Sequence, residues 1–187
     1  IDLIGDGWIE LVRHLNKPWI ACNRSPDEGG NWCGGEEKRI EQLLKAVELR
    51  ADIIDIELEM KNLAEMVSLI KERAKCLLSL HEFKKTPPLN KMREIIQREI
   101  DAGADICKLV TTAQRLEDNQ AVLQLIADFP QTRVVTMAMG PLGLASRLLC
   151  PLVGGDFTYA SIEQGKESAP GQLTVRELRK LYDRVQE

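Results

Sequence analysis

The sequence is poor in the residues that most often mark metal sites, disulfide frameworks or aromatic recognition surfaces. Among its 187 residues are two histidines, His14 and His81, and aromatic residues make up only 4%. The five cysteines are odd in number and form no CxxC pair, so neither a zinc site nor a disulfide framework is expected. Cys22, Cys76 and Cys107 lie in or beside apolar runs, where a free thiol behaves as a small hydrophobic group. This pattern predicts a reduced, cytoplasmic setting without a metal.

Long apolar runs and an excess of basic charge are also missing. No run approaches the roughly 20 apolar residues that a bilayer-spanning helix needs, and no basic-then-apolar signal segment opens the sequence. The net charge is -4, which gives no indication of a nucleic-acid partner. The 44% of hydrophobic residues suits one globular domain with a sizeable core.

Short β-rich runs alternate with longer amphipathic patterns along the chain. The strand candidates are nearly continuous apolar runs, as expected of parallel strands that are buried on both faces. They cover residues 19–23, 52–58, 75–80, 105–110, 133–139 and 156–160. Helices are predicted before Trp19 and over residues 36–50, 62–73, 89–102, 117–129, 142–149 and 174–186, the last with Thr174 as N-cap. Strict alternation of this kind is typical of a parallel α/β domain.

Two parallel architectures fit this alternation. A doubly wound sheet is comfortable at this length, whereas a (β/α)8 barrel typically needs about 250 residues. With six full strands, the chain has about two strand–helix units fewer than a complete (β/α)8 barrel. The opening, "IDLIGDGWIELVRHLNKPW", reads as the tail of a strand at Ile1, a turn at Gly5–Gly7 and a helix, which suggests that further residues precede Ile1.

Polar residues gather where the predicted strands end. Arg24 and Glu28 lie in the loop "NRSPDEGG", Glu57 and His81 end two strands, and Arg147 follows the strand that ends at Met139. In parallel α/β folds, functional groups collect at the carboxyl ends of the strands. The pattern therefore favours a site at that edge of the sheet.

Lys108 is the clearest anomaly, because it stands within the apolar strand "DICKLV". Burial disfavours an ammonium group, and a neutral amine can attack a carbonyl to form a Schiff base. The alternative is a lysine that faces outward or pairs with Asp55 or Glu57, and position alone favours that structural role.

The other candidates also have structural alternatives. A histidine that ends a strand, as His81 does, is more often hydrogen-bonded than catalytic, although its pKa suits proton transfer near neutrality. Glu28 alone would be a solvated charge, but "EGG" could form a flexible turn that closes over a ligand. Arg24 and Arg147 could bind a carboxylate through paired hydrogen bonds or form surface ion pairs.

Two further features could belong to a site. The polar segment "SIEQGKESAPGQ" before the last helix is either a lid or a mobile connector. Met137 and Met139 are expected to pack in the core. In a barrel they could line an apolar wall of the site.

Six segments together resemble the type I 3-dehydroquinate dehydratases, which are (β/α)8 enzymes of the shikimate pathway. They occur in the family's order over nearly the whole chain: "RSPDEGG", "DIIDIEL", "LSLHEFKKTP", "GADICKL", "TMAMGPLGLASRL" and "SAPGQ". The resemblance implies a TIM barrel and a lyase that dehydrates 3-dehydroquinate to 3-dehydroshikimate. It also implies no metal, no cofactor and a homodimer.

The resemblance assigns roles to individual residues. Lys108 matches the lysine that forms the Schiff base, His81 the general acid/base, and Glu28 the glutamate that positions and tunes that histidine. The residues implied to bind the substrate are Arg24, Arg147, Ser168 and Gln172.

One part of the family pattern is absent. A Glu-x-Arg pair on the family's second strand would precede Ile1–Asp2, and the first strand and helix are missing as well. We therefore expect residues 1–187 to form a single catalytic barrel domain that is incomplete at its N-terminus. Such a chain is expected to be poorly active alone, because an open barrel exposes a strand edge.

Two other functions are compatible with a lysine-bearing barrel. A non-catalytic ligand-binding relative would be expected to lack the lysine or the histidine, yet both Lys108 and His81 are present. Another lysine-imine lyase, such as an aldolase, would not be expected to carry the "HEF", "EGG" and "SAPGQ" segments together.

Overall fold

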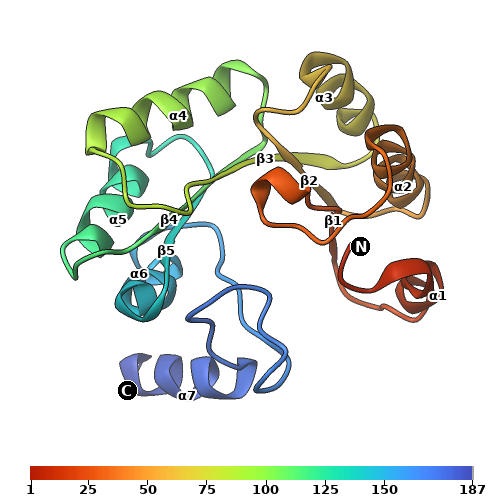
Figure 1. The fold of residues 1–187 in the computed structure, drawn as a ribbon. Coiled ribbons are helices and arrows are strands. Elements are labelled where there is room, and N and C mark those ends of the chain that lie inside the picture. Colours follow the sequence, from red (N-terminus) through yellow and green to blue (C-terminus); the bar gives the residue numbers. More distant parts are fainter. Residues whose placement is uncertain (187) are drawn as a thin grey trace. The chain divides into compact units, whose positions relative to one another are not determined.

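Strands and helices alternate along the chain in the computed structural model, which describes residues 1–186 (Figure 1). One sheet contains five strands in chain order: β1 (Ile20–Cys22), β2 (Ile53–Glu57), β3 (Lys75–His81), β4 (Ile106–Thr112) and β5 (Val134–Met139). The helices are α1 (Trp8–Arg13), α2 (Glu36–Glu48), α3 (Leu63–Lys71), α4 (Leu89–Asp101), α5 (Asp118–Asp128), α6 (Leu144–Leu149) and α7 (Val175–Gln186). The predicted parallel α/β class is confirmed.

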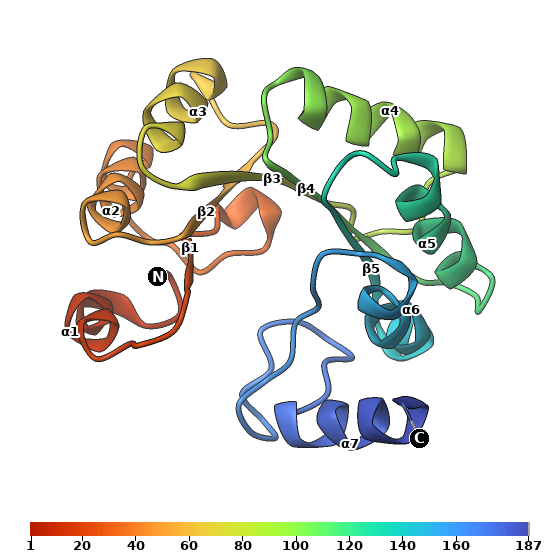
Figure 2. The same cartoon turned by 180° about the vertical axis from the view of Figure 1, so that it is seen from behind.

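The residues divide into two units, each described by itself. The first comprises residues 1–80 and 97–107. In it β1 pairs with β2 and β2 with β3, both in parallel. Helices α2 and α3 neighbour each other in both views and are amphipathic, so that each buries one apolar face (Figure 2). Leu43 of α2 and Ile70 of α3 are fully buried.

The second unit comprises residues 81–96 and 108–187. Helices α5 and α6 pack against β5. The side chain of Asn119 connects α5 to α6 and to the turn before it. Its Nδ2 donates to the carbonyl of Leu142 at 2.7 Å, and its Oδ1 accepts from the amide of Ser146 at 2.9 Å. The hydroxyl of Tyr182 attaches α7 to the carbonyl of Leu148 at 3.0 Å.

Strands β2, β4 and β5 are buried along nearly their whole length, as expected of parallel strands with both faces covered. Every residue of β5 is buried, and so is every residue of β4 except Thr112. Charged side chains inside such strands are costly unless they are paired, which draws attention to those that do occur.

The sequence prediction was wrong over residues 156–160, which do not form a strand. The amide of Asp156 donates to the carbonyl of Val134, but the chain then continues without a regular ladder to an isolated bridge between Ser161 and Thr174. An apolar run becomes a strand only where a neighbour accepts its hydrogen bonds. Ile1, the expected end of a strand, is not part of a strand and is followed by a turn over residues 2–4. The helix boundaries differ from those predicted by no more than two residues.

No helix within residues 1–186 is both long and apolar enough to cross a membrane.

The buried strands predict a strong dependence of stability on their core residues. Leu78 in β3 is fully buried, and Leu69 in α3 is 39% exposed. We expect Leu78→Ala to lower the free energy of unfolding by about 2 to 5 kcal/mol because it leaves a cavity. The control Leu69→Ala should change it by less than about 1 kcal/mol. Urea denaturation of both variants measures this, and equal losses would contradict the burial pattern.

Candidate active site

Arg24, in the first unit, is a buried arginine surrounded by carboxylates. Its Nη2 donates to Asp55 Oδ1 at 2.6 Å and its Nη1 to Ser79 Oγ at 2.7 Å. Nη1 also lies 3.3 Å from Glu57 Oε1 and 3.9 Å from Glu28 Oε2. The hydroxyl of Ser79 in turn donates to Asp55 at 2.7 Å. Strand ends that are distant in the sequence thus share one ionic network.

This network determines the electrostatics of Arg24. Burial alone would lower the pKa of the guanidinium, but Asp55, Cys22 and Glu57 act in the opposite direction and raise that pKa well above its ordinary value. Arg24 is therefore permanently charged. Its charge is largely compensated by the protein itself.

The loop that follows Arg24 makes a tight turn. Ser25 caps a short 3-10 turn by accepting a hydrogen bond from the amide of Asp27, and Gly29 adopts a left-handed φ of 80°. A Cβ on Gly30 would lie 1.9 Å from the carbonyl oxygen of Arg24. Both glycines of "EGG" therefore serve the close return of the chain, which leaves Glu28 half-buried beside Arg24.

His81 and Lys108, in the second unit, lie on neighbouring strands. The amide of Glu82 donates to the carbonyl of Val110 at 2.8 Å, so the ends of β3 and β4 are hydrogen-bonded. The His81 ring is half-buried and stacks on Phe83 with ring centroids 6.0 Å apart. Lys108 is only 6% exposed, which confirms that it is buried within its strand.

The aromatic ring of Tyr159 lies close to the side chain of Lys108. The Lys108 Nζ lies 4.8 Å from the centre of that ring, and Phe157 packs edge-on against it at 5.5 Å. A cation over an aromatic face is attracted by the ring's quadrupole. Tyr159 was not predicted as a neighbour of Lys108, because residues 156–160 were expected to form a strand and no sequence signal places this ring near the lysine.

Arg147 is buried in a different way from Arg24. It is 4% exposed, its Nη2 donates to the carbonyl of Pro170 at 3.3 Å, and its Nη1 lies 3.1 Å from Met137 Sδ. Its Nε has no hydrogen-bond partner, and no ion pair with a carboxylate is found for it within residues 1–186. Burial lowers the pKa of Arg147 to about 10. A buried cation without a carboxylate partner is suited to bind an anionic group.

The "SAPGQ" segment lies against Arg147. Gly171 approaches the chain so closely that a Cβ would be 2.7 Å from the carbonyl oxygen of Gly140. Ser168 and Gln172 bond to each other twice, at 3.1 and 2.9 Å. The structure therefore brings Arg147, Ser168 and Gln172 to one place in the second unit.

Cys107 precedes Lys108 and is fully buried. Burial, and then the nearby Glu99 carboxyl group, raise the pKa of this thiol far above its ordinary value. Because the thiolate is the reactive form, Cys107 acts as a packing residue and not as a nucleophile. Within residues 1–186, no group of three or more histidine, cysteine, aspartate and glutamate residues could hold a metal ion.

The acidic partners of Arg24 had a sequence signal that was not used. Asp55 and Glu57 alternate within "DIIDIEL", which places both on one face of a strand, and register aligns Glu57 with Ser79. From the sequence, both acids were expected as possible partners of Lys108, and Glu57 also as one of the polar residues at the strand ends.

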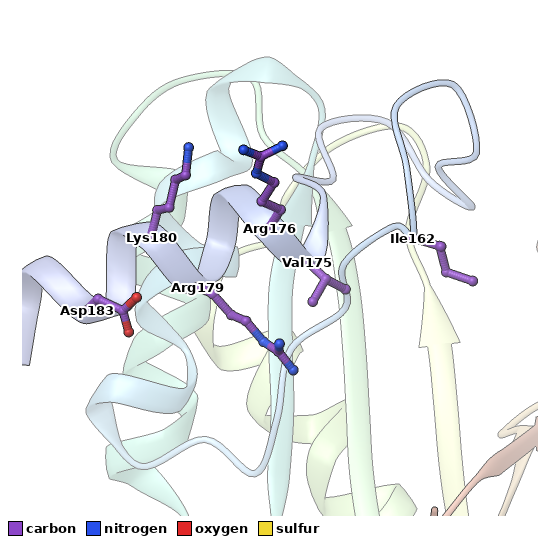
Figure 3. A pocket seen from close by; sticks show the side chains of 6 residues that line it. All are labelled: Ile162, Val175, Arg176, Arg179, Lys180 and Asp183. Atoms are coloured by element: carbon purple, nitrogen blue, oxygen red, sulfur yellow. The ribbon is translucent and has the colours of Figure 1, made fainter.

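An open pocket on the second unit is separate from all the expected site residues. It is lined by apolar and charged side chains, mostly of α7 (Figure 3): Ile162, Val175, Arg176, Arg179, Lys180 and Asp183.

Comparison with known proteins decides the family. The family model described as type I 3-dehydroquinase matches residues 6–187. The chain belongs to the type I 3-dehydroquinase family. A 3-dehydroquinate dehydratase of Dehalococcoides mccartyi is 41% identical over 185 residues, which are 99% of this chain and 83% of that protein. One from Methanosarcina mazei is 38% identical over 98% of this chain and 82% of its own length.

Solved dehydroquinases share the fold. The crystal structure of 3-dehydroquinate dehydratase from Geobacillus kaustophilus has a TM-score of 0.81 at 29% identity, over 90% of this chain and 68% of that one. The type I dehydroquinase of Clostridium difficile, solved with covalent modified comenic acid, has a TM-score of 0.83 at 26% identity, over 95% and 72%. The expected barrel family is thereby confirmed for this dehydroquinase.

The loop geometry makes Gly30 the most sensitive glycine of the site. We expect Gly30→Ala to lower the free energy of unfolding by about 1 to 3 kcal/mol, because the added methyl group collides with the Arg24 carbonyl. The matched control is Gly35→Ala, where a Cβ meets nothing within 4 Å, and its cost should stay below about 1 kcal/mol. Chemical denaturation of both variants is the measurement, and equal stability of the two would refute the tight return of the loop.

Proposed function

We propose that the protein is a 3-dehydroquinate dehydratase of the shikimate pathway that works through an imine on Lys108. The observation that carries the proposal is a buried lysine in β4, next to the strand that ends at His81, in a chain of this family. Residues 1–187 belong to one catalytic domain of a cytoplasmic homodimer that uses no metal or cofactor.

The proposed reaction balances with two catalytic groups. The Nζ of Lys108 attacks the C3 ketone, and the resulting carbinolamine loses water to give a protonated imine. The imine withdraws electrons, so His81 removes the acidified C2 proton and leaves an enamine. Return of that proton to the C1 hydroxyl on the same face expels water, and hydrolysis of the imine releases 3-dehydroshikimate and free Lys108.

Glu28 and the arginines complete the proposed machinery. Glu28 positions His81 and supports its protonated form. Arg147 binds the substrate carboxylate, which supplies the negative charge that its surroundings lack, and Arg24 contacts substrate oxygens. Ser168 and Gln172 exchange their mutual hydrogen bonds for contacts with the substrate.

Borohydride trapping tests the imine directly. We expect incubation with 3-dehydroquinate followed by reduction to inactivate the enzyme and to leave an adduct on the peptide containing Lys108. Lys108→Ala should lose the adduct and more than about 1000-fold in kcat, whereas His81→Ala should still be trapped but lose about 100- to 10,000-fold in kcat.

Lys91→Ala, which removes a lysine of an exposed pair with Glu94, is the matched control and should behave as wild type. A full-length enzyme with neither turnover nor adduct would refute the proposed function. Turnover that persists in Lys108→Ala would refute the imine mechanism alone.

Arg147 should show opposite effects on binding and stability. We expect Arg147→Met to raise KM by about 100-fold, because a charge-assisted pair with the substrate carboxylate is lost. The same variant should unfold at equal or higher denaturant concentration, because a buried cation without a carboxylate partner is removed.

Arg133→Met is the control for this experiment, since its guanidinium forms an exposed two-bond pair with Asp156 at 2.8 and 2.7 Å. It should leave KM unchanged. A marked loss of stability in Arg147→Met with an unchanged KM would show that Arg147 is a structural residue.

A further inference from the structure

Arg39 is a buried arginine on α2 to which the function proposed above gives no role. Only 2% of its side chain is exposed. Burying a guanidinium is unfavourable unless its donors are satisfied, so the partners of Arg39 show what it contributes.

The donors of Arg39 are divided between its own helix and the strand ends beside the site. Nε and Nη2 donate to the carboxylate of Glu36, each at 2.8 Å. Nη1 donates to the backbone carbonyl of Asn23 at 2.7 Å and to Glu57 Oε2 at 2.8 Å. Asn23 directly precedes Arg24, so Arg39 Nη1 binds the backbone where the loop that carries Arg24 and Glu28 begins.

Glu57 extends this connection to the loop itself. While its Oε2 faces Arg39, its Oε1 accepts from the amide of Ser25 at 2.9 Å and lies 3.3 Å from Arg24 Nη1. Glu57 is only 4% exposed. Loss of Arg39 would remove the partner that fixes one of its oxygens and would let the carboxylate turn away from Ser25.

The loop that carries Arg24 and Glu28 also forms hydrogen bonds to the backbone of Ser25. The carbonyl oxygen of Ser25 accepts from the amides of Glu28 and Gly30, at 3.0 and 2.9 Å. A displacement of the Ser25 backbone therefore displaces Glu28 with it.

We propose that Arg39 is a positioning residue for the loop that carries Arg24 and Glu28, acting through Asn23 and Glu57. The inference rests on the proposed function. The simpler alternative is that Arg39 only attaches α2 to the sheet. An attachment of that kind would affect the amount of folded enzyme, whereas positioning affects catalysis by each folded site.

The two roles are separated by normalising activity to folded sites. Arg39→Met and Arg39→Lys are compared with wild type by steady-state kinetics with 3-dehydroquinate, and competent sites are counted by borohydride trapping. We expect Arg39→Met to lower kcat/KM per trapped site by about 100-fold, since small misplacements of catalytic groups have effects of that size. Arg39→Lys should recover about tenfold of this loss, because it keeps the charge but not the planar fork.

The control is Arg98→Met, which removes an exposed arginine that pairs with Glu59 at 2.7 Å. Its kcat/KM per trapped site should equal that of wild type. A wild-type value in Arg39→Met, with only a lower midpoint of thermal unfolding, would overturn the proposal. If Arg39→Met does not fold, Arg39→Lys decides: a roughly tenfold reduction supports positioning, and a wild-type value refutes it.

The effect of Arg39 on the loop can also be measured in a protein without turnover. If wild-type protein shows no turnover, amide hydrogen exchange of Arg39→Lys is compared with that of Arg98→Met. Faster exchange confined to Ser25, Glu28 and Gly30 supports positioning of the loop. Unchanged exchange at these amides overturns it.

Discussion

Burial of parallel strands on both faces is the constraint on which the other features depend. Apolar side chains predominate in β4 and β5, so a buried charge is costly there unless a partner compensates it. The exceptions are therefore informative. Arg24, Lys108 and Arg147 are all buried, and all three lie within residues 6–187, which match the family model.

Arg24 and Arg147 are both buried, but their surroundings compensate the charge of only one of them. Arg24 is compensated within the protein by Asp55 and Glu57, which raise its pKa. Arg147 meets a thioether and a carbonyl, and burial lowers its pKa. A fold that retains such an unfavourable cation gains little stability from it. Its value is expected in binding a negatively charged ligand.

Two glycines near the expected site residues allow close approaches of the backbone. Gly30 and Gly171 each stand where a side chain would collide with a backbone carbonyl. They allow the loop of Glu28 and the segment of Ser168 to approach the chain closely.

The sequence by itself predicted the α/β class, the five strands of the sheet together with a sixth that does not form, the helix positions and the family, because apolar periodicity and short motifs are local properties. It also placed Lys108 inside a strand and His81 at a strand end, and the structure confirms both positions. Only the tertiary structure decided that residues 156–160 form no strand, since a ladder needs a partner that the sequence does not reveal. It alone showed Tyr159 beside Lys108, the acids around Arg24, and Arg39 behind Glu57. These are contacts between residues distant in the chain, and they depend on register and packing, which local pattern does not specify.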